Sequence, residues 1–296
     1  MTEAFDLGAY MEERKNLIEA NLRPVFPGED VPEVLFDSMR YSLLSGGKRL
    51  RPMLCLATAE TFGIPVGKAL PAALALELIH CYSLIHDDMP AMDDDDLRRG
   101  KPTNHKVYGE ATALLAGDGL LTHAFYLLSS PLGVDTERQL AMIQRLSHAA
   151  GPYGMVGGQQ ADLLAEHKEG TLAELEFIHS RKTGALIQAA VVIGGLFADL
   201  TALQRQALES YGANIGLAFQ MMDDWLDVAG DTEKLGKTQG SDLRLEKFTY
   251  PRLMGLEKTK MRAIESVNSA LSALEGAKIE SVQLTEIAKF IVARAF

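Results

Sequence analysis

The chain has 296 residues, of which 47% are apolar and 23% are charged, and its formal net charge is −11. A net negative charge disfavours non-specific nucleic-acid binding, and two cysteines rule out a disulfide framework and suit a reducing compartment. The acidic N-terminal sequence lacks the features of a secretory signal, and the longest nearly apolar run, 184–198, is too short to span a bilayer. We therefore expect a cytoplasmic protein with no membrane-inserted segment and no nucleic-acid partner.

Apolar residues recur with a period near 3.6 and almost never with a period of 2, which predicts an all-α fold. The first helix carries Leu17, Ile18 and Leu22 on one stripe, and the second covers 31–44 and stops at Gly46-Gly47. Pro52 is placed to start a third helix and Pro71 a fourth. Later helices are predicted at 110–130, 135–150, 155–168, 171–197, 201–229, 249–275 and 281–295. No Pro/Gly/Ser-rich linker divides the chain, so we expect residues 1–296 to form one domain.

An acidic cluster follows the fourth predicted helix. It consists of Asp87, Asp88, Asp93, Asp94, Asp95 and Asp96. On an ideal helix Asp87 lies about 20° from His80 and about 40° from Ser83, so these three side chains share a face. Pro90 ends or kinks the helix, which lets Asp93 fold back towards Asp87.

A second acidic cluster, Asp223, Asp224 and Asp227, also lies at the end of an apolar helix, and Gln220 precedes Asp223 by about one turn. Such dense carboxylates repel one another unless they are solvated, protonated or shared by cations. Oxygen ligands without nearby cysteine suit Mg²⁺. A solvated acidic loop is the simpler interpretation of one cluster alone, and two clusters at helix ends favour metal binding. A calcium loop starting at Asp93 fits badly, because Arg98 would replace its glycine and Asn104 its glutamate.

Basic residues accompany both acidic clusters. They are Lys48, Arg49, Arg51, Arg98, Arg99, Lys182, Lys237 and Lys247. Guanidinium groups bind phosphate in a bidentate way, and lysine supplies a point charge. In an acidic protein this pattern predicts a polyanion held by metal ions on one side and by cations on the other. Surface salt bridges are the alternative interpretation.

Five motifs occur in one order along the chain: GGKRLRP, HDDMPAMDDDDLRRGKPTNH, GGQQADL, KTGALI and FQMMDDWLDVAGD. With them the chain resembles the short-chain trans-prenyl diphosphate synthases, most closely the bacterial farnesyl diphosphate synthases. The resemblance implies a bundle of about ten or more long helices around a central apolar cavity, usually as a homodimer. It also implies a reaction in which isopentenyl diphosphate is condensed with an allylic diphosphate.

The resemblance assigns roles to individual residues. About three Mg²⁺ ions would be held by the aspartates of the two motifs, with two at Asp87 and Asp93, a third at Asp223, and Asp88, Asp224 and Asp227 completing the sites. The allylic diphosphate would be bound by Arg98, Lys182 and Lys237, and isopentenyl diphosphate by Gly47, Lys48, Arg51, His80 and Arg99. Lys182, Thr183 and Gln220 would lie beside the departing diphosphate. Lys247 matches the basic position of a mobile segment, although Glu246 stands where relatives commonly have glycine.

Product length depends in this family on Tyr82 and Ser83, the fifth and fourth residues before Asp87. An aromatic residue at the fifth position, with the Pro90-Ala91 insertion, implies a farnesyl (C15) product. The helical wheel places Tyr82 about 140° from Asp87, so its interpretation as an ordinary core aromatic stays open. Geranylgeranyl (C20) or geranyl (C10) synthesis is the nearest alternative. A terpene cyclase and a non-catalytic regulatory subunit are more distant ones, because both aspartate motifs and GGKRLRP are intact.

Overall fold

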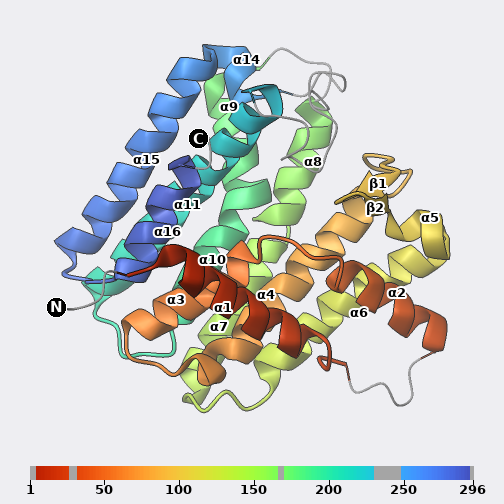
Figure 1. The fold of residues 1–296 in the computed structure, drawn as a ribbon, viewed down its shortest axis with the longest axis horizontal. Coiled ribbons are helices and arrows are strands. Elements are labelled where there is room, and N and C mark those ends of the chain that lie inside the picture. Colours follow the sequence, from red (N-terminus) through yellow and green to blue (C-terminus); the bar gives the residue numbers. More distant parts are fainter. Residues whose placement is uncertain (1–4, 27–31, 166–169, 230–247, 294–296) are drawn as a thin grey trace.

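A computed structural model describes residues 5–26, 32–165, 170–229 and 248–293 (Figure 1). Its helices are α1 (Leu7–Leu22), α2 (Glu33–Leu43), α3 (Leu50–Thr61), α4 (Val66–Asp87), α5 (Asn104–Tyr108), α6 (Glu110–Ser129), α7 (Thr136–Ala150), α8 (Met155–Ala165), α9 (Leu172–His179), α10 (Ala185–Gly195), α11 (Ala202–Ala229), α14 (Tyr250–Met254), α15 (Leu256–Gly276) and α16 (Val282–Ala293). A π-helical turn, η1 (Ser180–Gly184), joins α9 to α10. Two short strands, β1 (Leu97–Arg98) and β2 (Lys101–Pro102), pair antiparallel. The predicted all-α fold is confirmed.

Side-chain caps fix the start of several helices. Asp6 accepts a hydrogen bond from the backbone N–H of Ala9 at the start of α1. Thr171 and Glu174 form a reciprocal capping box at the start of α9. Such caps satisfy backbone donors that a helix end leaves unpaired. They position the ends of α1 and α9 without help from the core.

Helix α10 lies at the centre of the core. Nine of its residues, from Leu186 to Gly195, are buried, and its sequence is apolar apart from Gln188. A helix of this kind must be surrounded by other helices, and α3, α4, α7 and α11 pack against it. A Cβ atom at Gly194 would lie 2.2 Å from the carbonyl oxygen of Cys55 on α3, so glycine is required for this close approach.

Two further helix pairs flank this centre, α4 with α6 and α11 with α15 (Figure 1). The hairpin of β1 and β2 follows the C-terminal end of α4 and lies beside α5. The second aspartate cluster lies near the C-terminal end of α11. The fold thus presents both acidic clusters at helix ends, as the sequence predicts.

The structure corrects several predicted boundaries. Helix α4 begins at Val66 after Pro65, so Pro71 lies inside the helix and does not start it. The predicted helix at 171–197 is divided by η1, and the predicted helix at 249–275 is broken at Gly255, where φ is +83°. The hairpin and α5 were absent from the predicted elements, because two-residue strands carry no detectable period-2 signal.

Two of the described helices, α4 and α6, are long and apolar enough to cross a membrane by length and composition alone. In α4, 78% of the most apolar window is buried inside the protein, as in a core helix. In α6 only 33% of that window is buried. Both cysteines, Cys55 and Cys81, are buried and free, so the prediction that the chain has no disulfide framework is confirmed.

Candidate active site

The first acidic cluster folds back on the end of α4. After α4 ends at Asp87, the backbone N–H of Asp93 donates to the carbonyl oxygen of Asp87 at 2.9 Å. Asp94 completes the turn with φ at +48°, a left-handed conformation that aspartate tolerates. The predicted return of Asp93 towards Asp87 is therefore confirmed at the level of the backbone.

The Asp87 carboxylate lies in an environment that disfavours its charge. Its pKa is raised to about 6, chiefly by burial; the Lys182 ammonium opposes this rise and Asp93 adds to it. Within the described part of the chain, Asp87 forms no ion pair within 4 Å. A carboxylate in this situation gains free energy from a bound cation.

Asp88 differs from Asp87 because a protein cation already holds it. Its side chain is buried, and Oδ1 accepts a hydrogen bond from Nε of Arg98 at 2.8 Å. Arg98 also lies 3.3 Å from Asp95. The structure thus brings Arg98, predicted to bind the allylic diphosphate, against the first aspartate motif.

The three aspartates of the second cluster have different surroundings. Asp223 is partly exposed, with Nζ of Lys48 at 4.0 Å from its Oδ1. Asp224 is buried and accepts hydrogen bonds from Nε2 of Gln220 at 2.7 Å and from the backbone N–H of Tyr250 at 3.1 Å. Asp227 is also buried. Asp223 is thus the most accessible of the three, while Asp224 fixes the side chain of Gln220 and the start of α14.

The π-helical turn η1 carries Lys182 and Thr183. Such turns widen the helix by one residue and occur often at functional sites. The turn lies directly against α8, since a Cβ atom at Gly158 would be 2.2 Å from the backbone nitrogen of Lys182. The second glycine of the GGQQADL motif therefore permits the close packing of α8 on η1.

Lys182 is held by Asp162, which lies one turn after Gly158 on α8. Its Nζ donates to Oδ2 of Asp162 at 2.6 Å. Burial works to lower the pKa of Lys182, but Asp162, Asp87 and Asp93 together outweigh it and hold this pKa above its ordinary value. Lys182 is therefore a positioned cation that faces the first aspartate motif.

Thr183 and Gln220 form a short polar chain. The Thr183 hydroxyl donates to Oε1 of Gln220 at 2.7 Å, and the amide nitrogen of Gln220 donates to Asp224. Both ends of the Gln220 amide are thus fixed, which selects one orientation of its dipole. The resemblance implied that both residues lie beside the departing diphosphate, and the structure shows that their side chains contact each other.

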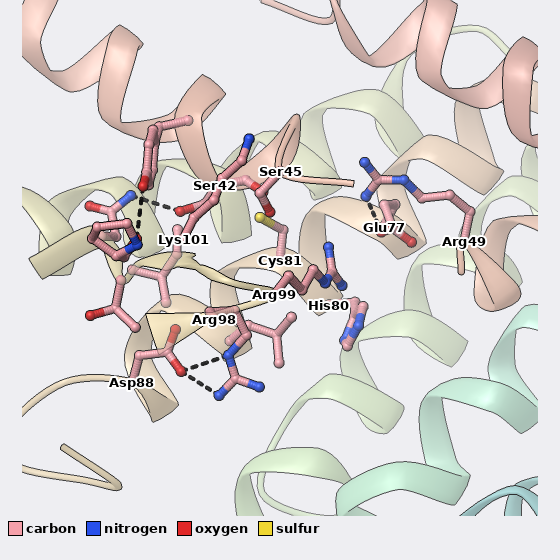
Figure 2. A pocket seen from close by; sticks show the side chains of 16 residues that line it. Ser42, Ser45, Arg49, Glu77, His80, Cys81, Asp88, Arg98, Arg99 and Lys101 are labelled. Carbon is pink, nitrogen blue, oxygen red and sulfur yellow. Dashed lines mark hydrogen bonds and ion pairs between the residues drawn. The ribbon is translucent and has the colours of Figure 1, made fainter. Parts of the chain in front are cut away.

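Several of the predicted cationic residues line one pocket, called the cationic pocket below (Figure 2). Arg99, His80 and the Arg49–Glu77 pair line it, together with the Asp88–Arg98 pair on its other side. Burial and the neighbouring guanidinium groups lower the pKa of His80 well below its ordinary value. His80 is therefore a neutral hydrogen-bonding group among fixed positive charges.

Gly47 and Lys48 lie at the border of this pocket. Gly47 has φ at +134°, and a Cβ atom there would lie 2.7 Å from the Arg99 guanidinium, so only glycine fits. The largely exposed side chain of Lys48 extends over the ring of Phe219, at 5.8 Å, and towards Asp223. The GGKRLRP loop therefore connects the cationic pocket with the second aspartate motif.

Tyr82 and Ser83 lie one turn before the first aspartate motif. Tyr82 is buried, and its ring packs edge-on against His86 with 5.7 Å between the centroids. Nε2 of His86 hydrogen-bonds with the carbonyl oxygen of Leu114 on α6 at 3.0 Å. Ser83 donates to the carbonyl oxygen of His80 at 2.9 Å. Through His86, Tyr82 is therefore linked to α6.

Two predicted site residues, Lys237 and Lys247, lie outside the described residues. Two residues that the sequence did not single out are Asp162 and Glu77, which bind Lys182 and Arg49 respectively. Asp162 was visible in the GGQQADL motif, whereas Glu77 looks like one charged residue in an apolar helix. The signal for both was a charge on an otherwise apolar face.

The donor set fits Mg²⁺ rather than a softer metal, because both motifs offer carboxylate oxygens only. Among the described residues, no group of three or more His, Cys, Asp or Glu side chains forms a complete metal cage. Mg²⁺ commonly binds one or two carboxylates, several waters and substrate phosphates, so it needs no such cage. The isolated Asp87 carboxylate is the clearest candidate ligand.

Known proteins share this sequence and fold. A family model described as polyprenyl synthetase matches residues 32–285. The chain is 46% identical over 290 residues to the farnesyl diphosphate synthase of Bacillus subtilis (strain 168), covering 97% of this chain and 98% of that one. It is also 46% identical over 292 residues to the geranylgeranyl diphosphate synthase of Cyanophora paradoxa, covering 98% and 97%. The apo crystal structure of an FPP/GFPP synthase from Zymomonas mobilis aligns with a TM-score of 0.86 at 39% identity, covering 97% of this chain and 98% of that one. The chain belongs to the polyprenyl synthetase family.

Proposed function

We propose that the protein is a prenyltransferase that condenses dimethylallyl and geranyl diphosphate with isopentenyl diphosphate to give farnesyl diphosphate. The observation that carries this proposal is the arrangement of opposite charges around one site. The charge of Lys182 acts on Asp87, Lys48 lies 4.0 Å from Asp223, and Arg49, Arg98 and Arg99 line one pocket. Two diphosphates therefore have two chemically different places to bind.

The allylic diphosphate belongs with the aspartates and Lys182. Mg²⁺ bound there, which we propose to be about three ions at Asp87, Asp93 and Asp223, would neutralise the diphosphate and make it a better leaving group. Lys182, held by Asp162, places a positive charge beside the same group, which stabilises charge that develops in the transition state. The allylic C–O bond then breaks, and its electron pair leaves with the diphosphate.

Isopentenyl diphosphate belongs in the cationic pocket with Lys48, Arg51, His80 and Arg99. Held there, its double bond attacks the allylic cation, and a new C–C bond forms. Holding the two diphosphates side by side makes the reaction between them effectively unimolecular. The departed diphosphate accepts the proton that the product loses. Thr183 and Gln220, whose dipoles are fixed by their hydrogen bond, would lie beside the departing diphosphate.

The C15 product is favoured by Tyr82, which is buried one turn before Asp87 and held by His86. A C20 product is the second candidate, because the relatives include a geranylgeranyl diphosphate synthase as similar as the farnesyl diphosphate synthase. A C10 product would require an additional block nearer Asp87. A non-catalytic regulatory subunit is disfavoured by two intact aspartate motifs.

We further propose that the protein is a cytoplasmic homodimer. Helix α6 leaves Leu114, Leu115 and Tyr126 exposed, although it is among the most apolar helices described. Burial of this face against a second copy would remove apolar surface from water. Light scattering coupled to size-exclusion chromatography should give the mass of two chains, and a monomeric mass would contradict the dimer.

The condensation itself is tested by incubating the purified protein with Mg²⁺, dimethylallyl diphosphate and isopentenyl diphosphate and sizing the products by mass spectrometry. A dominant C15 product supports the proposal in full. A C20 or C10 product keeps the condensation and discards the role of Tyr82. The absence of any elongated product would overturn the proposed function.

A further inference from the structure

The loop Gly46–Arg51, whose last two residues begin α3, has a backbone conformation that contacts with other segments must stabilise. Gly46 and Gly47 have φ values of +85° and +134°, and Arg49 has φ at +51°. The left-handed conformation is accessible to glycine but unfavourable for arginine, so interactions elsewhere must hold Arg49 there. The same loop carries Lys48 and Arg51, which the proposed function assigns to isopentenyl diphosphate.

The Arg49 side chain supplies that support by pointing into the protein. It is 3% exposed, and its Nη1 donates to Oε1 of Glu77 on α4 at 2.6 Å. Its Nη2 donates to the carbonyl oxygen of Leu43 at the end of α2, at 2.8 Å. The planar guanidinium thus ties the loop to two helices at once, which a lysine cannot do in the same geometry.

Glu77 also belongs to the electrostatics of the pocket. It is 2% exposed, and its Oε2 has no hydrogen-bond partner among the described residues. Its charge raises the pKa of Arg51 and of Arg99, opposing the burial that lowers both. Figure 2 shows Arg99 and His80 between the Arg49–Glu77 pair and the Asp88–Arg98 pair. One buried carboxylate therefore serves several guanidinium groups.

Arg99 closes the other side of the loop. Its Nη1 donates to the carbonyl oxygen of Gly46, and its guanidinium lies against Gly47. The loop is therefore held between Arg99, which faces the pocket, and Arg49, which faces the core. Arg49 borders the same pocket, but it is 3% exposed and both its Nη atoms are already bonded to Glu77 and Leu43.

We propose that Arg49 and Glu77 are positioning residues for the isopentenyl diphosphate side of the site. The pair fixes the Gly46–Arg51 loop in the conformation that directs Lys48 and Arg51 to the diphosphate, and it does not touch the substrate. This inference rests on the proposed function. It separates Arg49 from Arg51, although both are arginines of one GGKRLRP motif.

The test is the steady-state kinetics of Arg49→Lys with each substrate varied in turn. Lysine keeps the positive charge but cannot donate to Glu77 and to the carbonyl oxygen of Leu43 in the same geometry. We expect the KM for isopentenyl diphosphate to rise about tenfold or more, while the KM for geranyl diphosphate and kcat stay within about twofold. Equal changes in both KM values, or no change in either, would overturn the inference.

A matched control and a second variant guard against a purely structural explanation. Arg14 forks onto Glu60 through 2.6 Å and 3.1 Å contacts away from the site, so Arg14→Lys should lower Tm and leave both KM values unchanged. The double variant Arg49→Met/Glu77→Leu replaces the buried pair with apolar groups, which proteins often tolerate. It should fold and still show the raised KM for isopentenyl diphosphate, and a wild-type KM in this variant would contradict the inference.

Calorimetric binding of isopentenyl diphosphate separates this inference from the proposed function. If the wild type binds isopentenyl diphosphate without forming product, the proposed condensation fails, and the variant-to-wild-type ratio of Kd still tests Arg49. We expect that ratio to be about ten or more for Arg49→Lys. If the wild type neither binds nor condenses it, both proposals are wrong.

Discussion

The two sides of the site balance their charges in different ways. On the cationic side, the positive charge comes from the protein, because Arg51 and Arg99 accompany Arg49, which pairs with the buried Glu77 at 2.6 Å. On the carboxylate side, burial raises the pKa of Asp87 to about 6, and among the described residues Asp87 itself has no ion pair within 4 Å. The first region supplies its own cations, whereas Asp87 gains most from a cation that binds from outside. Each side is thus suited to a different diphosphate.

The largest expected effect comes from removing the carboxylates that have to hold the external cation. Asp87→Ala and Asp223→Ala should each lower turnover by at least about 100-fold, because charge in the transition state loses its stabilisation. Asp87→Ala should not lower Tm, since burial disfavours ionised Asp87 in the folded protein, and Asp223→Ala should not lower it because Asp223 is partly exposed. Steady-state kinetics and thermal unfolding measure both quantities.

Asp96→Asn is the matched control within the same acidic cluster. Asp96 is exposed and pairs with Lys106 at 2.7 Å, so its loss should leave turnover unchanged. Wild-type turnover in Asp87→Ala would contradict the assignment of Asp87 as a metal ligand. Equal losses in Asp87→Ala and Asp96→Asn would show that only the total charge of the cluster matters.

A smaller effect is expected from Asp162→Asn, which weakens the hold on Lys182. The loss of a charge-assisted hydrogen bond of about 1.5–3 kcal/mol corresponds to roughly 10- to 100-fold in kcat if the bond acts only in the transition state. Pre-steady-state release of diphosphate should slow by the same factor, because the affected step is ionisation. An exposed control, Asp199→Asn, should leave kcat unchanged. An unchanged kcat in Asp162→Asn would show that Lys182 is positioned by other groups.

The product length can change while the charges of both sides stay intact. Tyr82→Ala removes the ring that packs on His86, and the product should lengthen to C20 or beyond with a rate near that of the wild type. Mass spectrometry of the dephosphorylated products measures this directly. The control is Phe125→Ala on the neighbouring α6, which also removes an aromatic ring, one that is partly buried and packs against the core. A C15 product from Tyr82→Ala would place the length-determining contact elsewhere.

The smallest effect concerns His80 on the cationic side. Arg49, Arg51, Arg98 and Arg99 add to burial in lowering its pKa well below 6.5. The unfolded chain therefore binds this proton first as the pH falls, and the protein loses stability below about pH 6.5. His80→Gln should show a smaller fall in Tm between pH 7.5 and 5.5 than the wild type does. Parallel Tm curves for the two proteins would contradict the lowered pKa.

The sequence predicted most of the helices and the grouping of the site residues. Periodicity located the long helices, and Pro90 correctly implied the return of Asp93 to Asp87. Periodicity did not predict η1, because a π-helical turn has no distinct residue pattern and leaves the apolar periodicity of its flanking helices intact. Pro71 misled the boundary of α4, because proline is ordinarily tolerated only in the first turn of a helix, whereas α4 starts at Val66 and continues through Pro71.

Partners of the charged groups were the least predictable part of the site. Arg49 and Arg51 stand two residues apart in one motif and no sequence signal gave Arg49 a partner, yet Arg49 bonds Glu77, 28 residues away in sequence. Likewise, Asp162 and Lys182 are 20 residues apart and meet only because Gly158 lets α8 approach η1. Such pairings depend on helix packing, which a pattern within one segment does not contain.

One calorimetric comparison tests most directly the claim that the two sides differ in how their charge is balanced. Isopentenyl diphosphate and a non-reactive thio analogue of geranyl diphosphate are each titrated into the wild-type protein with Mg²⁺ and with EDTA. The expected result is that EDTA weakens binding of the allylic analogue by at least about 100-fold and that of isopentenyl diphosphate by no more than about threefold. An equal dependence of both ligands on Mg²⁺ would contradict the division of the site into a side that requires a metal and a side whose cations come from the protein.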